Sequence, residues 1–324
     1  MLSRVADAIY WSSRYVERAE NAARFVDVNL NLMLDTPIAK RDGWEPLVLT
    51  TGDQEWYYKH YEDASPEKVA WFLTFDRSYP NSLISTLSLA RENAQNAREV
   101  LSREMWQELN EVYLMVREAS RRPFTLGDMS AFYDRIKLAG IHYEGVTNAT
   151  LSRGEAWHFA RLGRLLERAD KTSLILDVKY YLLQRRAPET EALDQIGWTA
   201  LLNSVSGLQM YRQLYHFISP ENVTSFLLLN RHYPRAINYC TSEAQQSLHA
   251  ITGTPLDISR FEPERLLGQL RARLSYDLIS DVMEAGLHEY IDTVQERLNE
   301  IGAATQGLFF DDVPYLSAQS QSAQ

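Results

Sequence analysis

Apolar and small residues recur in steps of three and four from the second residue of the chain onward. The positions are Leu2, Val5, Ile9, Ser12, Val16, Ala19, Ala23, Val26, Leu30 and Met33. This spacing places one stripe along one side of an α-helix. The pattern therefore predicts a single long amphipathic helix at the N-terminus.

The same spacing returns in the middle of the chain, at Phe159, Leu162, Leu166, Ala169, Ser173, Leu176, Tyr180 and Leu183. Ser152 followed by Glu155 has the spacing of a capping box, so we expect this second long helix to begin at Ser152. The stretch 81–116 contains neither glycine nor proline and predicts a further long helix. No segment shows sustained period-two alternation, so the protein is predicted to be all-α.

Two pairs of segments resemble one another within the chain. Ser65–Pro80 and Ser219–Pro234 are identical at nine of sixteen positions, at an offset of 154 residues. Arg14–Val28 and Arg164–Val178 share Arg, Glu, Arg, Ala, Asp and Val at an offset of 150. Unrelated segments of sixteen residues would share about one identity. We assign the four extra residues to a polar loop at Arg185–Asp194.

These offsets predict two tandem copies of one multi-helix unit, residues 1–150 and 151–302. Each long helix has an apolar stripe to bury, so we expect the copies to pack as one globular body around a pseudo-twofold axis. Gly302 is the predicted end of the last helix, and residues 303–324 are predicted to be a flexible tail.

The repeated motif Arg-x-x-Glu-Arg-Ala supplies the main candidate site residues: Arg14, Glu17, Arg18, Arg164, Glu167 and Arg168. The Arg and Glu three residues apart can form surface ion pairs along one helix. Arg18, however, is in line with Trp11 and Tyr15, so we expect it to be at least half buried and to need partners. Carboxylates of the other copy would provide them in a structural network. The functional alternative makes the arginines a carboxylate or phosphate site and Glu17 or Glu167 a general base.

Arg77 and Arg231 form a second repeated polar feature, each three residues before a proline. In one interpretation their side chains hydrogen-bond to the free carbonyl groups at the end of the preceding helix. In the other they face the same cleft as the motif arginines and bind an anion there.

Composition narrows the partners and cofactors. The net charge of −10 argues against nucleic acid or an anionic membrane as the main partner. The single cysteine, Cys240, and the lack of a leader or a long apolar run favour the cytoplasm. Glu155-x-x-His158 has the spacing of carboxylate-bridged metal sites but has no second copy, so we expect no metal. Without a glycine-rich phosphate loop, we expect no nucleotide and no other cofactor.

Three blocks of sequence carry a family resemblance: residues 1–29, 90–110 (ARENAQNAREVLSREMWQELN) and 157–170 (WHFARLGRLLERAD). They resemble the bacterial Alpha-E family, named for its helices and a recurrent glutamate. The resemblance extends from Met1 to about Gly302. It implies association with circularly permuted ATP-grasp ligases and transglutaminase-like proteins in a peptide-forming or amide-forming system.

Three functional hypotheses follow. The first is an accessory partner of an ATP-grasp ligase, whose arginine-lined surface holds the ligase or an acidic peptide product. The second is an enzyme for aminoacyl or peptidyl transfer that uses the duplicated Glu/Arg motif. The third is a structural helical scaffold, which burial of both glutamates with every oxygen paired would favour.

Overall fold

The structure is a computed structural model that describes residues 1–35, 44–49, 51–123, 125, 129–184 and 191–311. Across these residues it contains fifteen helices and no strand, which confirms the predicted all-α class.

The helices follow one another with short connections. In the first half they are α1 (Ser3–Asp35), α2 (Glu45–Leu49), α3 (Gln54–His60), α4 (Pro66–Thr74), α5 (Leu83–Asn96), α6 (Arg103–Ala119) and α7 (Met129–Thr150). In the second half they are α8 (Glu155–Gln184), α9 (Glu191–Ser204), α10 (Leu208–Leu214), α11 (Pro220–Leu228), α12 (Ile237–Thr252), α13 (Glu262–Tyr276), α14 (Ile279–Ala285) and α15 (Leu287–Phe309).

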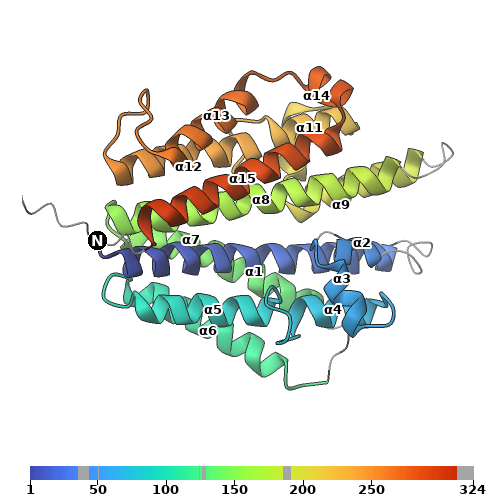
Figure 1. Ribbon diagram of the computed structural model, residues 1–324. Coiled ribbons are helices and arrows are strands. Elements are labelled where there is room, and N and C mark those ends of the chain that lie inside the picture. The colour runs from blue at the N-terminus through green and yellow to red at the C-terminus, as the bar shows by residue number, and fades with distance from the viewer. Residues whose placement is uncertain (36–43, 50, 124, 126–128, 185–190, 312–324) are drawn as a thin grey trace, which may run out of the picture.

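The two long helices, α1 and α8, lie side by side through the middle of the molecule (Figure 1). Helices α5 and α7 pack against α1, and α6 packs against both of them. Helices α12 and α15 pack against α8, and α13 packs against both of them. The long helices therefore form a central pair with a three-helix group on each side.

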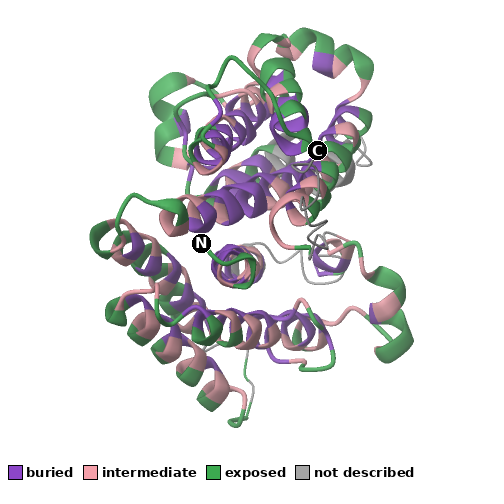
Figure 2. Ribbon diagram, turned by 60° about the vertical axis from the view of Figure 1, so that its left-hand side comes forward, coloured by how far each residue is buried: buried purple, intermediate pink, exposed green. Residues whose placement is uncertain are grey.

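The apolar core has one large cluster in each half, and a smaller one joins them. The first includes Trp44, Phe72 and Tyr133, and the second includes Trp198 and Phe226. A third cluster is shared between the start of α1 and the start of α8. Buried residues accordingly line the inner faces of the helices, whereas exposed residues gather on the outer helices (Figure 2).

A glycine allows the close approach of α8 to α1. A Cβ atom at position 163 would collide with the backbone carbonyl oxygen of Tyr10. Backbone atoms cannot swing aside as a long side chain can, so only glycine fits at this crossing without moving a helix.

The predicted long helix over 81–116 is wrong, because the chain breaks it after Asn96. Helix α6 starts anew at Arg103, where the Ser102 hydroxyl accepts a hydrogen bond from the Met105 backbone N–H at 3.2 Å. This cap satisfies one of the free N–H groups of the new helix and so favours a break over continuation.

Other boundaries also differ from the sequence expectation. Helix α8 begins at Glu155 rather than Ser152, and the Glu155 carboxylate instead pairs with the N-terminal amine at 2.6 Å. Helix α15 runs through Gly302 to Phe309, whose ring packs edge-on against Phe159 at a centroid distance of 5.2 Å. This packing stabilises turns that were predicted to be a tail.

Two predicted segments lie partly outside the described residues. Within the expected loop at 185–194, α9 already begins at Glu191, and residues 185–190 lie outside the described part. The end of the predicted tail, residues 312–324, also lies outside it.

The helix crossing gives a testable prediction. Gly163→Ala should lower the free energy of unfolding by about 1–3 kcal/mol, because the new methyl group overpacks the contact with α1. Gly145→Ala is the matched control: Gly145 is an exposed position within α7, and a Cβ there meets nothing within 4 Å. Alanine at 145 should therefore stabilise by about 0.5–1 kcal/mol. Urea unfolding measures both, and equal effects would contradict the close approach.

Candidate functional site

The two motif glutamates lie buried between α1 and α8, and each is bound by arginines of the opposite long helix. The Glu17 carboxylate on α1 accepts hydrogen bonds from Arg168 on α8, from Nε at 2.9 Å and from Nη2 at 2.7 Å. Arg235 adds a bond to Glu17 Oε1 at 3.0 Å. Only 2% of the Glu17 side chain is exposed.

Glu167 on α8 is bound in turn by two arginines of α1. Its carboxylate accepts from Arg14 Nε at 2.9 Å and from Arg18 Nε at 2.6 Å and Nη2 at 3.1 Å. The Glu167 side chain is 0% exposed, and Lys171 approaches it to 3.7 Å. The pairs therefore cross between the helices, and the Arg and Glu of one motif do not pair with each other as surface neighbours.

The network continues along α1 through Glu20. Arg24 donates to Glu20 Oε1 from Nε at 2.9 Å and from Nη2 at 2.7 Å, and Arg235 donates to it from Nη2 at 2.5 Å. The remaining Arg24 nitrogen, Nη1, donates to the Ser206 hydroxyl at 2.5 Å. Ser206 has a positive φ of 56° in the turn before α10.

Glu144 on α7 completes the network near Arg164. Its two oxygens pair with Arg164 Nη2 at 3.2 Å and with Arg168 Nη2 at 2.9 Å. The Arg164 Nε atom is buried and has no hydrogen-bond partner among the described residues. Burial lowers the pKa of Arg164, and Glu144 only partly offsets this effect.

The electrostatics keep both motif glutamates ionised. Burial alone would raise the pKa of Glu17, but the guanidinium groups of Arg168 and Arg235 outweigh it and hold the pKa well below its usual range. Burial is likewise outweighed at Glu167, where Arg14 and Arg18 hold the pKa well below normal. A carboxylate with such a low pKa has little affinity for a proton and makes a poor general base.

Arg18 is largely buried, as its position in the aromatic stripe predicted. Its side chain is 20% exposed, and its guanidinium lies 5.4 Å from the centroid of the Tyr15 ring. The guanidinium also donates from Nη1 to Asn81 Oδ1 at 2.8 Å. Arg14 lies similarly over Trp11, at 5.0 Å. These rings and carboxylates provide the partners that buried guanidinium groups require.

Arg77 and Arg231 lie outside this network. Arg77 is exposed in the turn after α4. Arg231 is also exposed and donates from Nη2 to the Ser275 carbonyl oxygen at 2.5 Å, near the end of α13 rather than the preceding α11. The structure therefore does not bring this second pair to the place where the motif arginines meet.

The sequence motifs did not single out Arg235, Arg24 and Glu144 as members of the network. Arg235 directly follows Pro234, and its counterpart at the offset of 154, Asn81, directly follows Pro80. Since both residues bind into the network, extending the repeat by one position would have pointed to them. Glu144 lies outside the repeated segments, so no such signal marked it.

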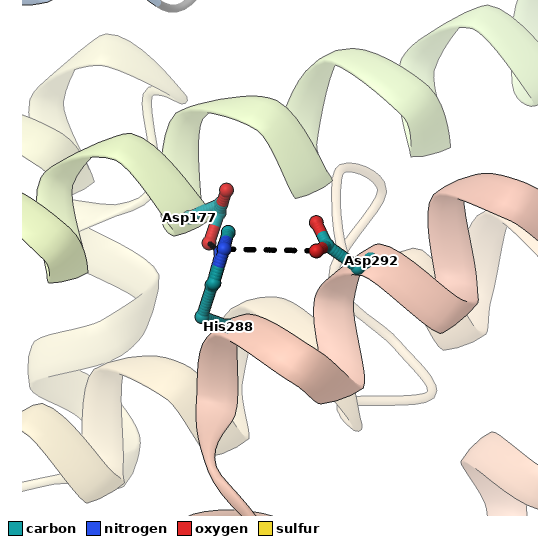
Figure 3. Close-up of side chains that lie close together, drawn as sticks. All are labelled: Asp177, His288 and Asp292. Carbon is teal, nitrogen blue, oxygen red and sulfur yellow. Dashed lines mark hydrogen bonds and ion pairs between the residues drawn. The ribbon is translucent and has the colours of Figure 1, made fainter.

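The remaining candidate residues, Glu155, His158 and Cys240, have different surroundings in the structure. Glu155 is engaged with the N-terminal amine, and His158 Nδ1 is a buried atom without a hydrogen-bond partner in the described part of the chain. Cys240 is buried, and burial raises the pKa of its thiol to about 12. A group of metal-ligand type lies elsewhere, between α8 and α15: Asp177, His288 and Asp292 (Figure 3).

Removing one arginine of the network should strongly destabilise the fold. Arg168→Ala should lower the free energy of unfolding by about 3–5 kcal/mol, because Glu17 would remain buried with its main counter-charge gone. The control is Arg297→Ala, which breaks the exposed pair with Glu300 and should cost under about 1 kcal/mol. Chemical denaturation measures both, and a small effect at Arg168 would mean that the pair contributes little.

The lowered pKa values of the buried glutamates also predict that the free energy of unfolding depends on pH. Glu167 is more acidic folded than unfolded, so its contribution to stability is complete above the unfolded value of about 4.5 and is lost as pH falls toward the folded value. The difference in unfolding free energy between wild type and Glu167→Gln should be constant from pH 7 to about 5 and shrink below about 4.5. Urea titrations across this range measure it. A difference that stays constant down to pH 3 would contradict the pairing.

Comparison with known proteins agrees with the repeated Glu-Arg dipeptides at 17–18 and 167–168. Residues 1–310 match the Alpha-E family, described as a predicted alpha-helical domain with a conserved ER motif. The uncharacterized protein Rv2567 of Mycobacterium tuberculosis is 23% identical over 92% of this chain, and the uncharacterized protein Mb2597 of Mycobacterium bovis is 22% identical over the same share.

The chain spans about a third of these relatives, since the matched region is 36% of each. No solved structure matches the chain. Among the described residues, no helix is long and apolar enough to cross a membrane. The family match covers both long helices and both copies of the motif, and on this ground the chain belongs to the Alpha-E family.

Proposed function

We propose that this Alpha-E domain is a non-catalytic helical scaffold that accompanies an ATP-grasp-type ligase in a peptide-forming or amide-forming system in the cytoplasm. The observation that carries the scaffold role is the saturation of Glu17 and Glu167. Each is at most 2% exposed and accepts hydrogen bonds from two arginines. Neither can take a proton from a substrate, because a base needs both access and proton affinity.

The length of the relatives supports a role beside a further part of a longer protein. In Rv2567 and Mb2597 the matching region is about a third of the protein, so an Alpha-E domain there is joined to a longer polypeptide. The family resemblance implies an ATP-grasp ligase as the partner, with a transglutaminase-like protein as a second companion.

We further propose that residues 1–150 and 151–302 are two copies of one unit around a pseudo-twofold axis. Matched contacts support this proposal. The Tyr57 hydroxyl donates to the Asp63 carbonyl at 2.8 Å, and 154 residues later the Tyr211 hydroxyl donates to the Phe217 carbonyl at 2.8 Å. Helices α4 and α11 both begin at the proline of a Ser-Pro pair. A duplicated unit explains why the glutamate–arginine pairs cross between the long helices.

A second candidate function is binding of a carboxylate, such as that of an acidic peptide product. A groove of about 310 Å³ lies where α1, α7 and α9 meet, and its lining includes Arg24, Lys137 and Ser206. Both cations already have protein partners, Arg24 with Glu20 and Lys137 with Asp27. A bound carboxylate would therefore have to compete with internal ones, which makes this the weaker candidate.

The scaffold proposal predicts the behaviour of a double variant. The wild-type chain should form a complex with its cognate ligase and increase the ligase's amide-forming rate, while the isolated chain neither binds nor hydrolyses ATP. Glu17→Gln together with Glu167→Gln should lower the melting temperature. At a temperature where circular dichroism shows the variant folded, it should still bind and stimulate the ligase fully, since no proton transfer depends on these groups.

Two outcomes would contradict the proposal. A folded double variant that binds the ligase but fails to stimulate it would assign acid–base chemistry to these carboxylates. ATP-dependent ligation by the isolated chain would remove the need for a partner.

A further inference from the structure

Three side chains with metal-binding groups meet between α8 and α15 (Figure 3). Asp177 comes from α8, and His288 and Asp292 lie one turn apart on α15. His288 Nδ1 is 2.7 Å from Asp177 Oδ1, and His288 Nε2 is 3.6 Å from Asp292 Oδ2. One possible ligand atom from each residue lies within 4.8 Å of the other two.

The first half of the chain offers an internal comparison for this place. Asp27 on α1 is the counterpart of Asp177 at the offset of 150. Helices α7 and α15 begin at Met129 and Leu287, an offset of 158. At that same offset, the Thr147 and Thr305 hydroxyls each donate at 2.7 Å to the carbonyl four residues earlier.

At this offset of 158 residues, Asp134 corresponds to Asp292 and Lys137 corresponds to Gln295. The Lys137 ammonium lies between the two aspartates of the first half, 2.6 Å from Asp27 and 2.7 Å from Asp134. A cation therefore neutralises both carboxylates where α1 meets α7.

The second half keeps both aspartates but has no lysine in that position. Gln295 replaces the cation, and its buried Nε2 atom has no hydrogen-bond partner among the residues that the structure describes. His288 stands where Ser130 stands in the first half, and Ser130 donates to Asp27 at 2.9 Å. Among the side chains that the structure describes, no arginine or lysine forms an ion pair with Asp177 or Asp292. The second half thus has two carboxylates together with a neutral amide and an imidazole. This set of groups suits a metal cation in the position that the Lys137 ammonium takes in the first half.

We propose that Asp177, His288 and Asp292 bind one divalent transition-metal ion, with Zn²⁺ as the best match, and that the ion joins α15 to α8. Zn²⁺ takes imidazole nitrogen and carboxylate oxygen together at about 2.0–2.2 Å, whereas Mg²⁺ and Ca²⁺ favour oxygen ligands alone. Binding of a single ion requires side-chain rotations from the present spacing, in which one ligand atom of each residue lies within 4.8 Å of the other two. Gln295 follows Asp292 by three residues on α15, so it lies on the same side of the helix and offers an amide oxygen as a fourth ligand.

The site is open to an arriving ion. His288 and Asp292 have 48% and 52% of their side chains exposed, whereas Asp177 is 15% exposed. The metal would thus enter from the α15 side and meet its most buried ligand last.

Calorimetric titration of the full untagged chain with ZnCl₂ tests the proposal. The wild type should bind one equivalent. Asp177→Asn should weaken binding at least about tenfold, because one charged ligand is lost. Gln295→Lys should abolish binding, because its ammonium would occupy the place of the ion as Lys137 does in the first half. The metal-free Gln295→Lys protein should melt no lower than wild type, which shows that the loss is not unfolding.

The matched control is His142→Asn. His142 forms a similar exposed contact with a single carboxylate, Nδ1 to Glu108 at 2.6 Å, but it lacks the second aspartate. This variant should bind Zn²⁺ as wild type does. The proposal is overturned if the wild type binds no Zn²⁺, if Asp177→Asn and Gln295→Lys both bind as tightly as wild type, or if His142→Asn abolishes binding.

Discussion

The fold depends on two crossed carboxylate–guanidinium pairs between α1 and α8. Glu17 is held by Arg168 of the opposite helix, and Glu167 by Arg14 and Arg18. Charges at this depth are stable only with good geometry, because the loss of hydration must be offset by several hydrogen bonds. A shift of either helix by one turn would leave buried charges unpaired, so the pairs fix how the long helices sit against each other, and with them the three-helix groups on each side.

The same pairing limits what the motif can do. Arginines that saturate a buried glutamate lower its pKa and leave it with little affinity for a proton. Arginines that are occupied by internal carboxylates have few donors left for a ligand. The recurrent Glu-Arg motif of this domain therefore joins the two long helices, which is what the proposed scaffold role rests on.

Each half of the chain has a pair of neighbouring aspartates, and the two pairs have different partners. Where α1 meets α7, Lys137 neutralises a pair of aspartates, whereas the pair between α8 and α15 contacts His288. A lysine provides a permanent charge. A histidine with two aspartates instead offers ligands, which is the basis of the proposed metal site.

The sequence by itself determined the helical class, the two long helices and the burial of Arg18, because local periodicity records which face of a helix is apolar. It did not determine the break after Asn96, which occurs although neither glycine nor proline interrupts the sequence there. Nor did it determine the continuation of α15 past Gly302, where packing outweighs the low helix propensity of glycine. The sequence offered pairing between the two motifs as one of several alternatives, and only the tertiary structure decided for it and added Arg235. Partners more than a hundred residues apart leave no periodic signal, and whether a carboxylate is a base or a buried counter-ion depends on how many guanidinium groups surround it.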